Sequence, residues 1–194
     1  MIDKKIIKEA KELALAEIKK YNASEKFFEI ANTKGQKLAK KLGADKNIVM
    51  LGTLFMDLKV SECVAEGKVP EHIQRSADSA KIVLDKYKSA NQLTQEEYDK
   101  ILNCIEAHHA TKPYACKESE ICANADCYKF LHPRGFINYA MILGERDKDA
   151  DKVLDALEAK MDEKIKIVSL DICKKELERN YKKFKKIIAQ ARKG

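Results

Sequence analysis

The chain has 194 residues, of which 45% are hydrophobic and 36% are charged, and its formal net charge is +7. This composition excludes an intrinsically disordered chain, and no apolar run approaches the ~20 residues that a membrane-spanning helix needs. Residues 1–5 lack the apolar segment of a secretory signal, so we expect a cytoplasmic protein whose six cysteines stay reduced.

The first three predicted helices follow from apolar residues at helical spacing. They cover about residues 3–20 and 25–42 and an apolar run at 48–58, with Ser24 and Asp45 as N-caps. The third helix is apolar nearly all round, which is typical of a central helix that is covered on several sides.

The later elements are predicted from caps, loops and further periodicity. Gly67 and Pro70 mark a loop, and Thr94 with Glu97 forms a capping box that begins a helix. Residues 111–119 are expected to form a loop, and Pro133 to end a short helix. The predicted helices cover about residues 71–87, 94–109, 124–131, 148–165 and 169–192. Since no repeat, linker or strand pattern interrupts them, we predict a single all-α domain over residues 1–194.

A few polar side chains in these helices suggest a site. Asp57 ends the apolar third helix, where an unpaired carboxylate would be costly to bury. His72 opens the next helix, His108 and His109 are adjacent near the end of the fifth, and Asp126 lies in the following short helix. Imidazole nitrogens and carboxylate oxygens together make a site for a first-row transition metal.

The order of these elements resembles the HD superfamily of metal-dependent phosphohydrolases. The resemblance implies an orthogonal helical bundle, with an HD-like core at about residues 24–132 and a C-terminal extension of two long helices at about 146–194. It covers about residues 25–131. The segments that carry it are residues 38–45, 52–57, 71–77, 105–109 and 125–126.

Two positions depart from the family pattern. Phe27 and Met56 stand where the resemblance places two histidine ligands of the first metal, and neither side chain suits Mg²⁺ or Mn²⁺. The first metal site is therefore predicted to be lost, although Asp57 and Asp126 remain. The resemblance implies that the family's second site is kept. The metal ligands that the resemblance implies are Asp57, His72, His108, His109 and Asp126.

Two alternatives stay open for this cluster. It can hold one divalent transition metal ion (Fe, Mn, Ni or Zn), or it can be a hydrogen-bonded polar cluster without metal. With metal, the resemblance implies attack of water on a nucleotide or other phosphorylated small molecule. Asp57 or Asp126 would then orient the water, and Lys59 or Arg75 would neutralise the phosphate. Both basic residues also fit a solvated surface, and an inactive HD-like binding or regulatory module is the alternative function.

The cysteines offer a second, weaker metal pattern. Cys116, Cys122 and Cys127 with His132 can be imagined as a zinc site or an iron–sulfur ligand set, but their spacing lacks a C-x-x-C pair. Cys104 lies one helical turn before His108. Reduced thiols, some buried as small hydrophobic side chains, are the simpler interpretation.

Most of the excess positive charge lies on the last predicted helix. Residues 171–194 include nine basic and three acidic residues and so carry a net charge of +6. An amphipathic helix that docks on the bundle and exposes its lysines explains this pattern. The alternative is an electrostatic surface for nucleic acid or another polyanion, although no nucleic-acid motif accompanies it. The sequence leaves the oligomeric state open, including a homo-oligomer.

Overall fold

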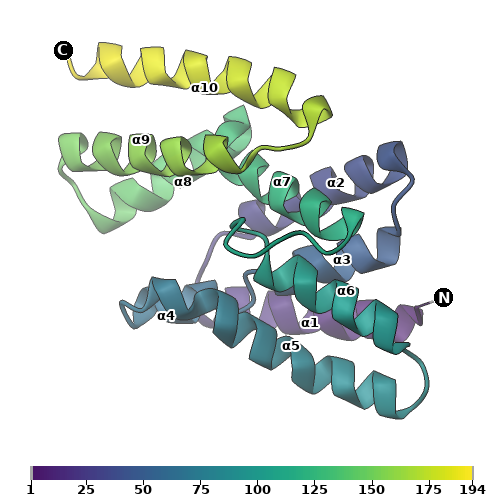
Figure 1. Ribbon diagram of the computed structural model, residues 1–194. Helices are drawn as coiled ribbons and strands as arrows, with labels where there is room; N and C mark the ends of the chain where they lie inside the picture. Colours follow the sequence, from purple (N-terminus) through teal and green to yellow (C-terminus); the bar gives the residue numbers. More distant parts are fainter. Residues whose placement is uncertain (1, 194) are drawn as a thin grey trace.

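The computed structural model describes residues 2–193, and within them every regular element is a helix, so the predicted all-α class is confirmed. Figure 1 shows α8, α9 and α10 gathered at one end of the molecule and α1 and α3 to α6 at the other. The helices are α1 (Lys4–Lys20), α2 (Glu25–Leu42), α3 (Lys46–Phe55), α4 (Val60–Ala65), the 3₁₀ helix η1 (Val69–Glu71), α5 (His72–Ser89), α6 (Gln95–Glu106), α7 (Lys117–Leu131), α8 (Pro133–Arg146), α9 (Ala150–Ile167) and α10 (Asp171–Ala191).

The central helix of the bundle is α7. It contacts α2, α3, α6, α8, α9 and α10, and every residue at 121–131 is buried. The sequence predicts only a short helix over 124–131, preceded by a loop at 111–119. A helix that is covered on all sides has no apolar stripe, so periodicity does not reveal where it begins.

The predicted third helix is shorter than its apolar run. It ends at Phe55, and the chain then turns through residues 56–59 before α4 begins. Hydrogen bonds between residues three apart, from Leu58 N to Phe55 O and from Val60 N to Asp57 O, replace the α-helical pattern there. Asp57 therefore lies in a turn rather than in a helix, and this turn directs its carboxylate toward the cluster described below.

Pro133 was predicted to end a helix, and in the structure it also begins the next one, which the sequence analysis did not predict. Proline suits the first turn of α8 because no backbone N–H is needed at that position. The new helix packs on α7 and α9, and Phe136 stacks on Phe184 of α10 with ring centroids 4.3 Å apart.

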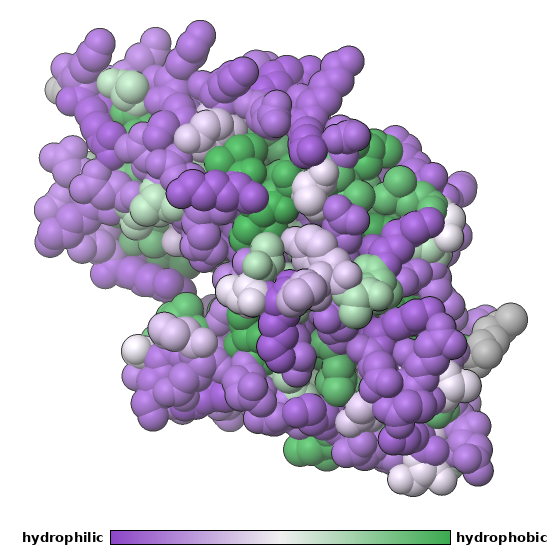
Figure 2. All heavy atoms as spheres, viewed as in Figure 1, coloured by the Kyte–Doolittle hydropathy of each residue, from purple (hydrophilic) through white to green (hydrophobic). Residues whose placement is uncertain are grey.

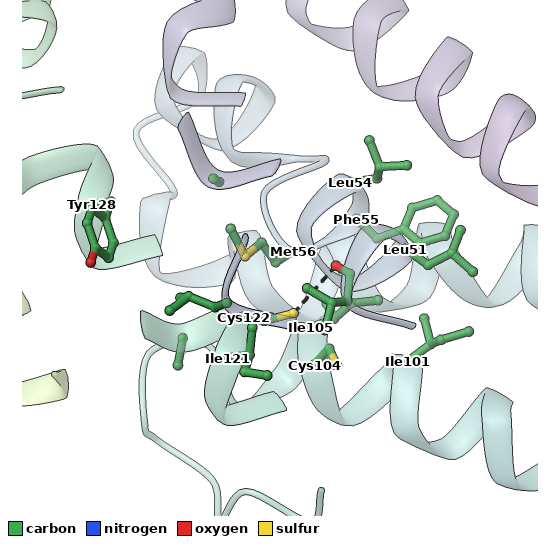
Figure 3. Packing of buried hydrophobic residues seen from close by; sticks show 14 of the residues in the cluster. Leu51, Leu54, Phe55, Met56, Ile101, Cys104, Ile105, Ile121, Cys122 and Tyr128 are labelled. Carbon is green, nitrogen blue, oxygen red and sulfur yellow. Dashed lines mark hydrogen bonds between the residues drawn. The ribbon is translucent and has the colours of Figure 1, made fainter. Parts of the chain in front are cut away.

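The helix starts that were predicted from Ser24, Asp45 and Thr94 are confirmed by their caps. Ser24 and Asp45 accept backbone N–H groups of the following turn, and Thr94 and Glu97 form the reciprocal capping box. Figure 3 shows part of the hydrophobic core between these helices, and Leu51, Phe55 and Ile105 are among its fully buried side chains. Among the described residues, none of the helices combines the length and hydropathy that crossing a bilayer requires.

The contact between α7 and α8 depends on a glycine. A Cβ atom at Gly135 would overlap the Lys129 carbonyl oxygen and lie 2.7 Å from its carbon, and backbone atoms cannot rotate away. We therefore expect Gly135→Ala to lower the free energy of unfolding by about 1–3 kcal/mol in urea denaturation. Gly144→Ala in the same helix has open space, so it should be neutral or stabilise by up to ~1 kcal/mol. Equal effects of the two substitutions would contradict this account.

Candidate metal centre

His72 is fixed where η1 passes into α5. Its Nδ1 lies 2.7 Å from the carbonyl oxygen of Val69, so Nδ1 carries the proton and donates it. The lone pair is then left on Nε2, which faces the interior. This backbone anchor is the arrangement that orients histidine side chains in metal sites.

His108 is fixed in the same way in the turn that follows α6. Its Nδ1 donates to the carbonyl oxygen of Ile105 at 2.7 Å, and the turn closes at Ala110, whose φ of 55° is left-handed. The side chain is 0% exposed. Its Nε2 is buried without a hydrogen-bond partner among the described residues. A buried nitrogen lone pair of this kind costs about 1–3 kcal/mol unless something binds it.

The side chains of His109 and Asp57 lie beside the imidazoles of His72 and His108. Ligand atoms of His72, His108 and His109 lie within 4.8 Å of one another, and no other group of three or more potential ligands in residues 2–193 does so. Asp57 Oδ1 lies 3.7 Å from Nε2 of both His72 and His108, which is too long for a hydrogen bond. The side chains of Asp57 and His109 are 22% and 20% exposed, so the cluster opens to solvent on their side.

The electrostatics of the histidines suit a cation. Burial lowers the pKa of His72, and burial together with the neighbouring His108 lowers the pKa of His109 to about 3. Both side chains are therefore neutral at physiological pH. Neutral imidazole is the form that binds a metal ion.

Two lysines that the sequence analysis did not consider complete the cluster. Lys129 Nζ forms ion pairs with Asp57 Oδ2 and, at 2.6 Å, with Asp126 Oδ1. Lys164 Nζ of α9 binds Asp126 Oδ2 at 2.6 Å and donates to His109 Nε2 at 2.9 Å. An ammonium group therefore lies between the two carboxylates, and the charges of two aspartates and two lysines balance.

These ion pairs hold all four groups charged. Burial raises the pKa of Asp57, but the charge of Lys129 together with the neighbouring His108 and His72 outweighs burial, and the pKa of Asp57 lies well below its usual range. Burial lowers the pKa of Lys129, but Asp126 and Asp57 outweigh it, so its pKa is raised. Burial raises the pKa of Asp126, but the charges of Lys129 and Lys164 outweigh burial, so its pKa is lowered. Burial lowers the pKa of Lys164, but Asp126 and its other neighbours outweigh burial, so its pKa is raised.

Phe27 lies on the lysine side of the cluster, and Met56 belongs to the turn that carries Asp57. The Phe27 ring centroid lies 5.8 Å from Lys129 Nζ, and the ring packs against Phe130. Met56 is buried directly before Asp57.

The predicted phosphate-binding residues are engaged elsewhere. Lys59 Nζ binds the carboxylates of Glu17 and Glu62 at 3.0 and 3.1 Å. Arg75 binds Glu62 as well as Glu66 and Glu71 at 3.2, 2.8 and 2.6 Å. Both cations are thus part of a surface ion-pair network, and their roles in binding substrate stay predictions.

All six cysteines are free thiols in the structure. Cys127 donates to the carbonyl oxygens of Ala123 and Lys164, and His132 lies against the Tyr128 ring. The zinc or iron–sulfur alternative needed Cys116, Cys122, Cys127 and His132 together. In the described part of the chain, they are not among the grouped potential metal ligands.

One face of α10 is exposed and carries its basic residues, and Figure 2 shows hydrophilic side chains over α10 at the top of the view. The opposite face of α10 is docked through Leu177, Phe184 and Ile188. The amphipathic interpretation is therefore confirmed, and binding of nucleic acid to the basic face stays a prediction. The exposed cations are Lys175, Arg179, Lys182, Lys183 and Lys186.

The centre is assembled from distant parts of the chain, namely the turn after α3, the start of α5, the turn after α6, and helices α7 and α9. The place of Lys129 beside Asp126 could have been predicted from the sequence, because Lys129 lies three residues after Asp126 and so on the same helix face. The place of Lys164 could not, because only the packing of α9 on α7 brings it near the cluster.

No family model matches the chain, and neither a curated protein nor a solved structure shows significant similarity to it.

Proposed function

We propose that the chain binds one divalent transition metal ion at His72, His108 and His109, with Asp57 beside them, and hydrolyses the phosphate ester of a small molecule such as a nucleotide. The observation that carries the proposal is the buried, unpartnered Nε2 of His108. It converges with Nε2 of His72 beside a carboxylate, and both rings are oriented by backbone carbonyls. Three imidazoles and a carboxylate suit Fe, Mn, Ni or Zn.

The surrounding charges favour a hydrolytic role over a purely structural one. The two lysines already balance Asp57 and Asp126, so a bound divalent ion would add net positive charge beside a solvent-accessible carboxylate. When bound, such an ion polarises a phosphoryl oxygen and lowers the pKa of water. Lys129 fixes Asp57 through Oδ2, which leaves Oδ1 directed at the imidazoles and available to orient water.

The family assignment is part of this proposal. The order Asp57, His72, His108–His109 and Asp126 is the one that the HD resemblance implies, and its members meet in one cluster. An HD-like core in which a lysine ammonium replaces the first metal accounts for Phe27 and Met56 as well. Phosphoester hydrolysis is therefore the activity to test first.

Two measurements test the proposal. Elemental analysis of the purified chain, as isolated and after incubation with Zn²⁺, Mn²⁺, Fe²⁺ or Ni²⁺, should give one metal ion per chain. Turnover of p-nitrophenyl phosphate and of a nucleotide panel should require that ion and be lost in His72→Ala. His132→Ala, which changes the histidine outside the cluster, should keep both metal and turnover. Bound metal without turnover would reduce the proposal to a metal-binding protein.

A metal-free binding or regulatory module is the second candidate, and a specific contact favours it. Lys164 occupies Nε2 of His109, so an ion must use the other ring nitrogen or displace the lysine. Lys129 and Lys164 also form ion pairs with both carboxylates and so balance their charges without any metal. No bound metal and no turnover with any of the four cations would establish this alternative over the first.

A further inference from the structure

Three thiols gather where α6 ends and α7 begins, outside the candidate metal centre. Cys104 is fully buried in α6, and Cys116 is partly exposed at the N-cap of α7. Cys122 follows in α7 and is buried beside Cys104, as Figure 3 shows, where both pack against Gly52. Of the three, Cys116 is the thiol that solvent reaches.

The loop between α6 and α7 is tied so that Cys116 lies beside Cys104. Asn103 Oδ1 accepts the backbone N–H of Ala115 at 2.8 Å, and its Nδ2 donates to the carbonyl oxygen of Pro113 at 3.2 Å. Asn103 directly precedes Cys104, and Ala115 directly precedes Cys116. The clamp therefore fixes the two thiols as neighbours, and the Cys104 thiol donates its hydrogen to the Cys116 sulfur.

The two thiols have opposite character. The hydrogen bond from Cys104 outweighs partial burial and, with the backbone N–H of Ser119, lowers the pKa of Cys116 to about 6. A cysteine at a helix N-terminus that is a thiolate at neutral pH is a strong nucleophile. Burial raises the pKa of Cys104, which stays protonated. An exposed thiolate with a protonated thiol beside it is the arrangement of a redox-sensitive pair.

We propose that Cys116 and Cys104 are a thiol pair that reacts with hydroperoxides and closes to a disulfide. The Cys116 sulfur attacks one oxygen of the peroxide, so that an S–O bond forms as the O–O bond breaks, and the departing oxygen takes a proton from solvent and leaves as water or an alcohol. Cys116 is thereby oxidised to the sulfenic acid. Cys104 then gives up its proton and attacks that sulfur, an S–S bond forms as the S–O bond breaks, and hydroxide leaves with the proton as water.

Cys122 is the competing partner and is less suited. It interacts with Cys104 as well, but its own thiol donates to the carbonyl oxygen of Val49, 3.7 Å away, and like Cys104 it is fully buried, so solvent does not reach it. No clamp comparable to Asn103 ties it to the loop. The geometry thus assigns Cys116 as the reacting thiol and Cys104 as the one that resolves it. The resulting bond would close the loop that carries His108 and His109.

The test is oxidation of the full chain with one equivalent of hydrogen peroxide at neutral pH, followed by alkylation, digestion and mass spectrometry. The expected product is a peptide pair joined through Cys104 and Cys116. Cys104→Ser should instead leave a sulfenic acid on Cys116 that dimedone labels, and Cys116→Ser should abolish both products. Cys63→Ser and Cys122→Ser should still form the bond. A bond between Cys104 and Cys122, or oxidation at no thiol, would overturn the assignment.

A second measurement needs no variant and so does not depend on folding of the serine substitutions. The rate of alkylation of Cys116 by iodoacetamide, followed by mass spectrometry, should rise with a midpoint near pH 6. An ordinary cysteine has its midpoint at about 8.5. A midpoint for Cys116 at the ordinary value would contradict the thiolate on which the first step depends.

Discussion

Replacing Lys164 with methionine is expected to lower the free energy of unfolding by about 3–5 kcal/mol, the cost of removing one partner of a buried ion pair. Lys164 is 0% exposed, and its Nζ lies 2.6 Å from Asp126, which is itself buried. Methionine fills a similar volume, so the loss is electrostatic rather than a cavity. Lys129 still pairs with Asp126 Oδ1, but Oδ2 is left buried without its partner. Urea denaturation followed by circular dichroism measures the effect.

The controls separate charge from packing. Lys166→Met changes an exposed lysine of the same helix and should alter stability by less than about 0.5 kcal/mol. Adding Asp126→Asn to Lys164→Met should recover part of the loss, because no uncompensated charge then stays buried. The folded pKa of Asp126 is below its ordinary 3.8, so the ion pair stabilises above that pH. The difference between wild type and variant should therefore shrink as pH falls below 3.8. A pH-independent difference would point to packing instead.

The sequence predicted the members of the histidine cluster better than it predicted their surroundings. Asp57, His72 and the histidine pair could be expected to meet, because each stands out as polar in an apolar helix or at its end. The pairing of two lysine side chains with both aspartates of the cluster could not be predicted. Lys129 belongs to a helix without amphipathic periodicity, and Lys164 lies in α9, whose face toward α7 is set only by tertiary packing. For the same reason the sequence does not predict the first part of α7 or any of α8, and Pro133 is compatible both with the end of one helix and with the start of the next.

The second prediction with a large effect concerns the affinity of the chain for Zn²⁺. In a titration of the wild-type chain with Zn²⁺, we expect one site, and His108→Ala should weaken it by more than about 100-fold. Removing a residue that only orients a ligand typically costs 10–100-fold, and His108 is proposed as a ligand itself. Its Nε2 makes no hydrogen bond within the described residues, so the substitution breaks none there. A chromophoric chelator in competition with the protein measures both affinities.

Two matched variants locate the ion within the molecule. His132→Ala removes a histidine that contacts Tyr128 and should leave the affinity unchanged. Cys116→Ser tests whether the thiols at the start of α7 bind Zn²⁺ instead, and it too should leave the affinity unchanged. Thermal unfolding of each variant shows whether the bundle is intact. If His108→Ala is folded and still binds Zn²⁺ like the wild type, the histidine cluster is excluded as the site. Zn²⁺ that is lost only in Cys116→Ser would place the metal at the cysteines, and the buried lone pair of His108 would then be an uncompensated cost of folding.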